Sequence, residues 1–304
     1  MAHPVSLDAL LKQCRVEDGA RFDPASHPTR IADLEGIGKS DGKHLLRRGV
    51  KRLSELQTLL YANGTWSLLL VFQAMDAGGK DGMIKHVMSG VNPQGVSVTS
   101  FKQPGPVELA HDYLWRVHMA APSCGRIGIF NRSHYEEVLV TRVHPELLVR
   151  QKIPASLRTD AIWQERYQDI RHFEHYLSRQ GTVVLKFFLN LSKEEQRRRF
   201  LQRIDEDQKH WKFSASDARE RTHWNAYQAA YHDAIRNTAS PHAPWVVVPA
   251  DRKWMARLLV METIIQALEA LNMTIPEPSQ DLIDDMAVVR KELVAEAPKK
   301  GHAA

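Results

Sequence analysis

The sequence contains very little cysteine and no long apolar run, and both shortages narrow the class of protein. Cys14 and Cys124 are the only cysteines among 304 residues, which is too few for a disulfide framework and fits a reducing cytoplasm. No stretch approaches the roughly 20 apolar residues that a membrane-spanning helix needs. The first residues lack a basic region followed by an apolar one, so we expect no signal peptide. These absences predict a soluble, cytoplasmic protein without a membrane partner.

Internal repeats and Gly/Ser-rich linkers are also missing, and low-complexity disorder is excluded for most of the chain. Hydrophobic residues make up 43% of the sequence and include seven Trp and nine Phe, enough for a sizeable buried core. Lys and Arg number 41 against 36 Asp and Glu, for a net charge of +5 and a pI near 9.1. This balance is a weak indication of an anionic partner.

Short apolar runs alternate with segments of helical periodicity along most of the chain. Such runs are typical of parallel strands covered on both faces, and the alternation predicts an α/β fold with a doubly wound, five-stranded parallel sheet. The expected strands lie at residues 66–72, 96–101, 127–130, 182–189 and 245–248. Helices are expected at residues 43–62, 80–90, 107–120, 134–141, 161–180, 193–235, 251–271 and 280–296.

We expect three parts in the chain. Residues 1–62 would form an N-terminal arm and a helix packed on the core, since the first forty or so are polar and rich in turn signals. Residues 63–272 would form the main domain. Residues 273–304, which begin with a proline-containing stretch, would form a C-terminal extension.

A glycine-rich loop follows the most apolar run directly and precedes a helical segment. In this context, inward-facing backbone N–H groups, a helix N-terminus and a lysine can cradle phosphates. The match to G-x-x-x-x-G-K-[ST] departs at Ala74 and at Asp81, so a plain surface turn is the alternative. Asp76 could supply the hard oxygen ligand for Mg²⁺ that the absent Ser or Thr would have provided. The predicted phosphate-binding loop comprises Ala77, Gly78, Gly79, Lys80 and Asp81.

A second polar cluster ends the apolar run at 127–130. Asn131 stands where a P-loop protein commonly carries an acidic residue, and Arg132 could bind phosphate through its planar fork. Ser133 and Glu136 have the spacing of a helix capping box, so Ser133 is predicted to be structural. For Glu136 a structural role and a functional role remain open.

The segment after the fourth expected strand is strongly basic. Arg198, Arg199 and Arg203 lie close together on one helix, and Lys209 and Lys212 flank a tryptophan further on. A solvated basic helix is the ordinary reading of such a run. The alternative is a mobile lid, at about residues 192–217, that supplies positive charge during phosphoryl transfer.

Taken together, these motifs resemble the polyphosphate kinase 2 family of P-loop phosphotransferases over about residues 30–272. The resemblance rests on five segments in order: 74–82 (AMDAGGKDG), 89–95 (SGVNPQG), 130–136 (FNRSHYE), 198–214 and 243–253. It implies a thymidylate-kinase-like fold with a helical lid, and assembly as a dimer of dimers. It also accounts for Asp76 within the loop and for the missing Ser or Thr.

The resemblance implies roles for individual residues. Asp76, Lys80, Arg132 and Glu136 would be catalytic, with Asp76 and Glu136 holding Mg²⁺, for which Mn²⁺ could substitute. Asn131, His134 and Glu136 would contact the nucleotide, in a version of the motif that resembles members accepting both nucleoside mono- and diphosphates. Polyphosphate would be bound by the loop, by Arg132 and by the lid cations Arg198, Arg199, Arg203, Lys209 and Lys212.

We therefore expect reversible, Mg²⁺-dependent transfer of the terminal phosphoryl group of inorganic polyphosphate to AMP or ADP, with GMP and GDP as further candidates. An ATP-dependent nucleoside monophosphate kinase is the rival enzyme. A GTPase switch lacks its Asn-Lys-x-Asp motif here. Nucleic-acid binding is not expected, because the basic residues concentrate around one cleft instead of alternating with stacking aromatics.

Overall fold

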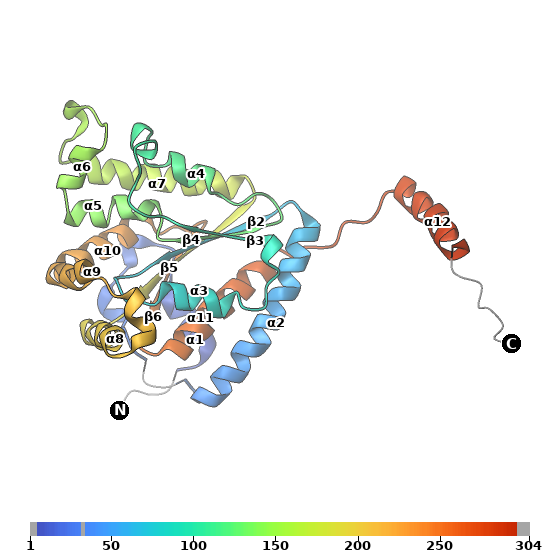
Figure 1. Ribbon diagram of the computed structural model, residues 1–304, viewed down its shortest axis with the longest axis horizontal. Coiled ribbons are helices and arrows are strands. Elements are labelled where there is room, and N and C mark those ends of the chain that lie inside the picture. The colour runs from blue at the N-terminus through green and yellow to red at the C-terminus, as the bar shows by residue number, and fades with distance from the viewer. Residues whose placement is uncertain (1–4, 32–33, 297–304) are drawn as a thin grey trace. The chain divides into compact units, whose positions relative to one another are not determined.

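The computed structural model describes residues 5–31 and 34–296, and the chain divides into two compact units, Met1–Met273 and Thr274–Ala304. The first unit is built on a sheet with strand order β1-β6-β5-β2-β4-β3. The strands are β1 (Arg15–Val16), β2 (Ser67–Gln73), β3 (Val96–Ser100), β4 (Ile127–Asn131), β5 (Thr182–Asn190) and β6 (Trp245–Pro249). Helices cover both faces of this sheet, as Figure 1 shows, so the α/β class is confirmed.

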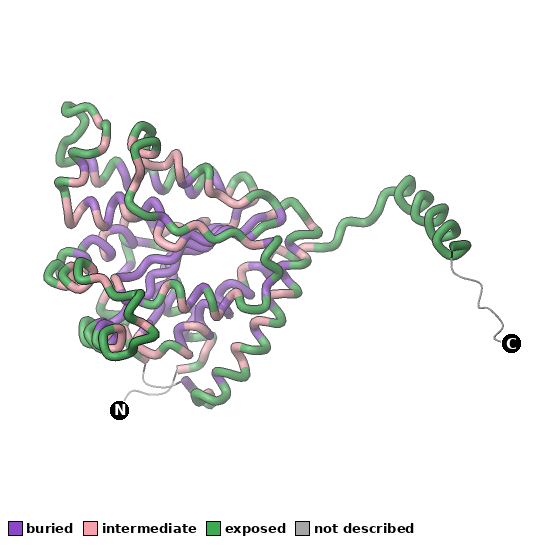
Figure 2. The backbone as a smooth tube through the Cα atoms, in the orientation of Figure 1, coloured by how far each residue is buried: buried purple, intermediate pink, exposed green. Residues whose placement is uncertain are grey.

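The central strands pair in parallel, with β2 between β4 and β5. Every residue of β2 is buried, and the sheet forms the middle of the core in Figure 2. The expectation of five strands was wrong by one, because β1 joins the edge of the sheet antiparallel to β6. With only two residues, β1 is too short to show periodicity, so only its pairing reveals it.

The N-terminal segment contributes to the core and does more than run over the surface. Helix α1 (Leu7–Cys14) is capped by Ser6 and buries Leu10, Leu11 and Cys14. Helix α2 (Lys39–Asn63) then packs along α11 (Lys253–Glu269). A Cβ on Gly42 would lie 2.3 Å from the Trp254 ring, so a glycine is needed for this close approach.

The remaining helices connect the strands. They are α3 (Lys80–Val87), α4 (Trp115–Met119), α5 (Val140–Val143), α6 (Glu146–Arg150), α7 (Ile162–Arg179), α8 (Lys193–Asp205), α9 (Ala215–Arg219) and α10 (Trp224–Thr238). Short 3-10 helices are η1 (Gly19–Arg21), η2 (Pro24–Ser26), η3 (Pro93–Gly95), η4 (Glu108–Ala110), η5 (His134–Glu137), η6 (Ala155–Leu157), η7 (Asp207–Lys212) and η8 (Glu220–His223). The long helix expected over 193–235 is broken, because Ser214 caps a new helix by accepting from the Asp217 amide.

The second unit contains α12 (Gln280–Ala295), which begins at the N-cap Ser279. Across the residues that the structure describes, no helix is both long and apolar enough to cross a membrane.

Candidate active site

The glycine-rich loop turns sharply between β2 and α3. Ala77 and Gly79 have φ angles of 59° and 97°, and the Gly78 amide donates to the Met75 carbonyl at 2.9 Å. A Cβ on Gly78 would lie 2.6 Å from the Met75 oxygen, so only glycine fits there. The Lys80 ammonium group folds back and donates to the Ala74 carbonyl at 2.8 Å. The loop therefore has the left-handed turns and the lysine of a phosphate cradle.

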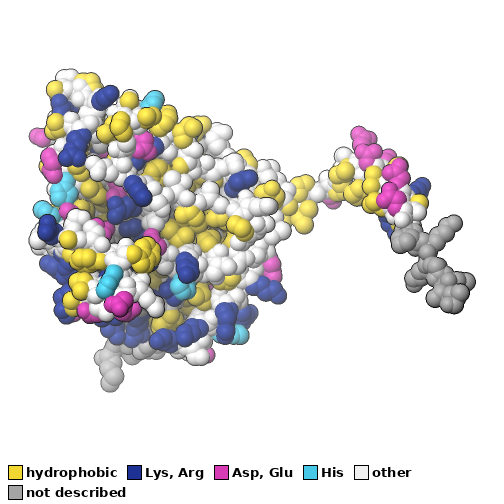
Figure 3. Space-filling model, viewed as in Figure 1, with side chains coloured by type: hydrophobic (Ala, Val, Ile, Leu, Met, Phe, Trp, Pro, Cys, Tyr) yellow, Lys and Arg dark blue, Asp and Glu magenta, His cyan; other side chains and the backbone are white. Residues whose placement is uncertain are grey.

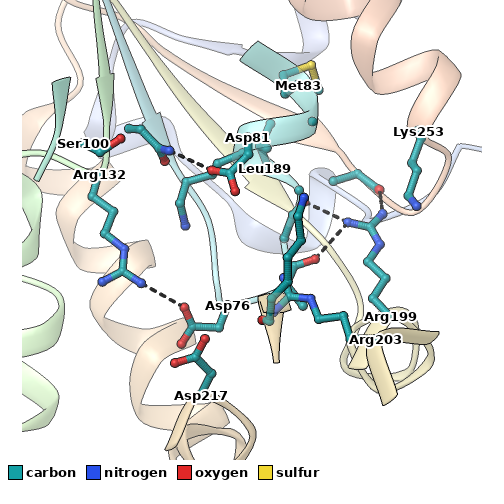
Figure 4. Close-up of a pocket in the computed structure, with 18 of the residues that line it drawn as sticks. Asp76, Asp81, Met83, Ser100, Arg132, Leu189, Arg199, Arg203, Asp217 and Lys253 are labelled. Atoms are coloured by element: carbon teal, nitrogen blue, oxygen red, sulfur yellow. Dashed lines mark hydrogen bonds and ion pairs between the residues drawn. The ribbon is translucent and has the colours of Figure 1, made fainter. Parts of the chain in front are cut away.

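Parallel pairing of β2 and β4 brings the two predicted motifs together at the carboxyl edge of the sheet. Arg132 lies 3.2 Å from the Asp76 carboxylate and 4.0 Å from that of Glu136, as distances from its guanidinium. Its φ of 64° is unusual for a residue with a side chain. Asn131 donates to Asp81 at 2.8 Å. Residues 50 and 56 positions apart thus form one charged cluster (Figure 4).

Charges in this cluster are only partly balanced by the protein. Burial raises the pKa of Asp76, although Lys80 and Arg132 act in the opposite direction. Burial also raises the pKa of Glu136, against the influence of the same two cations. The pKa of Lys80 is lowered by burial and then by Arg132. Each group would be better stabilised by a charged ligand, and a phosphate chain with its cation offers charges of both signs.

A cleft of about 590 Å³ opens beside the loop. Twelve of the residues predicted for the site line it, from the loop, the end of β4 and the basic segment. They are Asp76, Ala77, Gly78, Gly79, Lys80, Asp81, Asn131, Arg132, Arg199, Arg203, Lys209 and Lys212. Figure 3 shows Lys and Arg side chains gathering on the part of the surface over α8. The tertiary structure thus joins three separate motifs around one basic cleft.

The similarity of this chain to known proteins agrees with that geometry. A family model described as polyphosphate kinase 2 (PPK2) matches residues 36–276. The chain belongs to the polyphosphate kinase 2 family. An ADP-polyphosphate phosphotransferase of Rhodopseudomonas palustris is 48% identical over 93% of this chain and 98% of its own length.

Two further family members extend the comparison. An AMP/ADP-polyphosphate phosphotransferase of Meiothermus ruber is 47% identical over 88% of this chain and 96% of its own. The crystal structure of polyphosphate kinase 2 from Arthrobacter aurescens TC1 matches with a TM-score of 0.84 and 38% identity, covering 96% of this chain and 99% of that one. This PPK2 chain and that relative therefore share one fold over nearly their whole lengths.

Arg199 and Arg198 differ sharply in position, although they are adjacent in the lid sequence. Arg199 is buried and donates to the carbonyls of Gly78 at 2.8 Å and Ala250 at 2.6 Å, with Glu195 as its carboxylate partner. Its fork is therefore engaged by the protein itself. Arg198 is 57% exposed, pairs with Glu195 and does not line the cleft.

Two further cationic side chains, which were not predicted as site residues, also line the cleft. Lys253 and Arg257, at the start of α11, stand beside Arg199, and Lys253 is seen next to it in Figure 4. Burial lowers the pKa of Lys253, and Arg199 adds to the lowering. Lys253 could have been predicted from the sequence, because it ends one of the segments that carry the family resemblance. Arg257 lies one helical turn further on, outside those segments, and nothing in the sequence marked it as a site residue.

A second cavity of about 290 Å³ begins where the cleft ends. Phe101, Lys102, Gln103 and Arg132 line both spaces, and Glu136 lines only the second. The second cavity also has apolar walls, including Leu109 and Val140 among others. Arg132 thus stands at the junction of two adjoining spaces of different character.

His134 is not brought to either space. Its ring is fully buried, 3.5 Å from the Glu174 carboxylate. Glu174 also accepts from Tyr135 at 2.8 Å and from Lys186 at 2.6 Å, and Lys186 donates in addition to the Thr238 carbonyl at 2.8 Å. This buried network includes His134 and Tyr135, which follow Arg132 in the sequence. It therefore supports the site from within the core and does not line it.

The arrangement of carboxylates suits a cation that is shared with a ligand. Among residues 5–31 and 34–296, no group of three or more His, Cys, Asp or Glu side chains could hold a metal ion by itself. Mg²⁺ commonly uses one or two carboxylates together with substrate phosphates. Asp76 and Glu136, flanking Arg132, offer such a donor set. Asp217, which also lines the cleft, points toward Asp76 in Figure 4.

Proposed function

We propose that this chain transfers the terminal phosphoryl group of inorganic polyphosphate to AMP or ADP, using Mg²⁺ or, as a substitute, Mn²⁺. The observation that carries the proposal is the pair of adjoining cavities that meet at Arg132. A cleft of about 590 Å³ lined by many Lys and Arg side chains suits a linear phosphate polymer. A smaller, partly apolar cavity suits an acceptor nucleotide. Their junction is where a phosphoryl group would pass from one to the other.

The cleft favours a polyanion because several of its cations lack a carboxylate partner among the described ion pairs. Arg203, Lys212 and Lys253 line the cleft and take part in none of them. Mutual repulsion among such cations is relieved when phosphates bind between them. A polymer with one charge per phosphate would contact several at once. The names of the relatives, which act on polyphosphate with ADP or with AMP and ADP, support the same donor.

The protein's contribution to the reaction would be positioning and charge compensation. The transition state of phosphoryl transfer is loose and needs little covalent chemistry from the enzyme. Lys80 and the loop amides would hold the donor, and Arg132 would hold the oxygens of the group in transit. Asp76 and Glu136 would hold the cation. When bound, Mg²⁺ neutralises phosphate oxygens at the bond that breaks.

The finer features follow from the same proposal. We place the fold with the thymidylate-kinase-like P-loop kinases, with residues 192–217 as a lid that closes over the polymer. Asn131 and Glu136 would face the acceptor, and GMP and GDP would be further acceptors. Transfer would be reversible, in the cytoplasm, by a dimer of dimers. No nucleic-acid partner is proposed.

A donor–acceptor matrix tests this function. Polyphosphate or ATP is combined with AMP, ADP, GMP or GDP, with Mg²⁺, Mn²⁺ or EDTA, and products are separated by ion-exchange chromatography. We expect ADP and ATP from AMP and polyphosphate in the absence of added ATP, and no product with EDTA. No product from AMP and polyphosphate without ATP, together with product from ATP and AMP, would instead establish an ATP-dependent nucleoside monophosphate kinase and overturn the proposal.

A further inference from the structure

A buried arginine that the mechanism does not use lies behind the second cavity. Arg166, on α7, is only 3% exposed. It lines a third cavity of about 510 Å³ but not the second one, which the proposed function assigns to the acceptor nucleotide. Glu137 and Gln151 line both of these spaces and so form part of the wall between them. Arg166 therefore reaches this wall from the side that faces away from the acceptor.

The guanidinium of Arg166 binds that wall at three acceptor atoms. One of its nitrogens donates to the Glu137 carbonyl at 2.7 Å and to the Glu137 carboxylate at 3.1 Å. The other nitrogen donates to the side-chain oxygen of Gln151. Gln151 in turn donates to the Glu137 carboxylate. The three side chains thus form a closed ring of hydrogen bonds, so that none of them can move without breaking a contact with another.

Aromatic rings hold the planar head of Arg166 in place. It lies 5.1 Å from the centre of the Tyr113 ring and 5.7 Å from that of Trp163. Burial lowers the pKa of Arg166, and the Glu137 carboxylate acts in the opposite direction. A guanidinium presents its donors in a rigid fork, whereas the ammonium group of a lysine is a point charge. A lysine here would keep the ion pair but would not reach all three acceptor atoms at once.

This ring of hydrogen bonds connects two parts of the second cavity. Glu137 follows Glu136 directly in η5, and Glu136 lines the cavity at 4.0 Å from the Arg132 guanidinium. Holding the Glu137 carbonyl therefore fixes the backbone beside Glu136. Gln151 lies in the segment that follows α6, which forms another part of the same wall. Arg166 thus joins η5 to that segment.

We propose that Arg166 is a positioning residue for the acceptor nucleotide, which holds Glu136 and the wall of the second cavity in place without touching the ligand. The inference rests on the proposed function, which places AMP or ADP in that cavity. Stability alone does not account for this arginine, because a buried ion pair adds little compared with apolar side chains of similar volume. Placement does account for it, because an error of about 1 Å near the reacting groups can lower a rate about 100-fold.

Steady-state kinetics of Arg166→Lys in the full chain test this role. With saturating polyphosphate, we expect the KM for AMP to rise about tenfold, since the loss of one charged hydrogen bond at the wall corresponds to about that factor. The KM for polyphosphate, which binds in the cleft, should stay within about twofold of the wild-type value. Equal rises in both KM values, or an unchanged KM for AMP, would overturn the inference.

Arg142→Lys is the matched control. Arg142 pairs with Asp233 at 2.6 Å and donates to the Tyr167 hydroxyl at 2.7 Å. It lines neither the cleft nor the second or third cavity. The same substitution should therefore leave both KM values near those of the wild type. A rise in the KM for AMP equal to that of Arg166→Lys would show that the effect is a general loss of packing, and would overturn the inference.

A second variant shows whether Arg166 acts through the wall, and it decides the question if Arg166→Lys does not fold. Gln151→Met removes the neutral member of the ring, keeps the ion pair of Arg166 with Glu137, and should raise the KM for AMP about threefold. In the double variant the KM should rise no further than in Arg166→Lys, because both changes break the same ring. An unchanged KM in Gln151→Met, or fully multiplied effects in the double variant, would overturn the inference.

Failure of this inference is distinguishable from failure of the proposed function. If the wild type used ATP in place of polyphosphate, the donor assignment would be wrong. The KM for AMP could still be compared with ATP as the donor, and Arg166→Lys should still raise it. If instead the wild type used polyphosphate and Arg166→Lys left the KM for AMP unchanged, only the positioning role would be wrong.

Discussion

The guanidinium of Arg199 donates a 2.8 Å hydrogen bond to the carbonyl oxygen of Gly78. This bond joins α8, at the base of the predicted lid, to the centre of the phosphate loop. A neighbouring contact has the same effect, because Gln196 donates to the Asp76 carbonyl at 2.9 Å. The basic helix therefore holds the loop in shape by contacts with its backbone. A change in the position of α8 would be transmitted directly to the loop groups that we propose bind phosphate.

Arg199→Ala should destabilise the protein, because it leaves the carbonyls of Gly78 and Ala250 without this donor in a buried place. We expect a loss of about 2 kcal/mol or more in the free energy of unfolding. Arg198→Ala is the matched control: its side chain is 57% exposed, and the loss should stay within about 0.5 kcal/mol. Urea unfolding followed by circular dichroism measures both. Equal losses would contradict the role of Arg199 as a clamp.

Lys80→Ala should reduce turnover by about 100-fold or more, because the donor that we propose holds the phosphate oxygens is lost. Lys85→Ala, on the exposed side of the same helix, should leave turnover near the wild-type value. Initial rates with saturating polyphosphate and AMP measure the effect. A thermal unfolding curve checks that both variants are folded. Near-normal turnover by Lys80→Ala would remove the loop from the mechanism.

Glu136 should make the metal-free protein less stable as the pH rises through its titration. Because burial raises the pKa of this carboxyl in the folded state, the native protein binds more protons than the unfolded chain between the ordinary value, about 4.3, and the raised one. Stability from this group is thus present at low pH and lost as the pH rises through that window. The free energy of unfolding of Glu136→Gln, measured by urea titration, should exceed the wild-type value increasingly over that range. A constant difference would contradict the assignment.

Removing one member of the buried ion pair of Glu174 and Lys186 should greatly lower the free energy of unfolding, whereas replacing both should lower it only slightly. Either Glu174→Leu or Lys186→Met alone leaves an uncompensated charge in the core and should cost about 3–5 kcal/mol. The double variant should recover most of this loss, because a buried ion pair and an apolar pair of similar volume are close in free energy. A double-mutant cycle in urea measures the coupling. Additive losses would show that the two side chains act independently.

Strands and loop were predictable because their signals are local. Four of the six strands, β2, β4, β5 and β6, are near-continuous apolar runs, and a strand buried on both faces needs that composition. Strand β3 lies at the edge of the sheet and is mostly exposed, and its two valines alternate with polar residues. The phosphate loop is recognisable because glycines, a lysine and the following helix are adjacent in sequence. Strand β1 was missed, since two residues carry no periodicity and pair with a strand more than 200 positions away.

Arg198 and Arg199 illustrate what the local sequence could not predict, namely which side of the helix faces the loop. Both stand in one basic run and were assigned the same role, yet one is exposed and the other binds the loop backbone. A rotation of about 100° per residue along the helix separates them, and only the packing of α8 decides which side faces the loop. Arg257 was missed for the same reason, since its place in the cleft depends on how α11 meets the sheet.

The sequence by itself determined the fold class, the glycine-rich loop and the family, because each depends on residue types at short, regular spacing. The tertiary structure decided which charges share a site. Parallel pairing of β2 with β4 sets Arg132 between Asp76 and Glu136, and the packing of α8 commits Arg199 to the loop. These are contacts between residues far apart along the chain, and their energies depend on distance and burial. Neither quantity exists before the chain has folded.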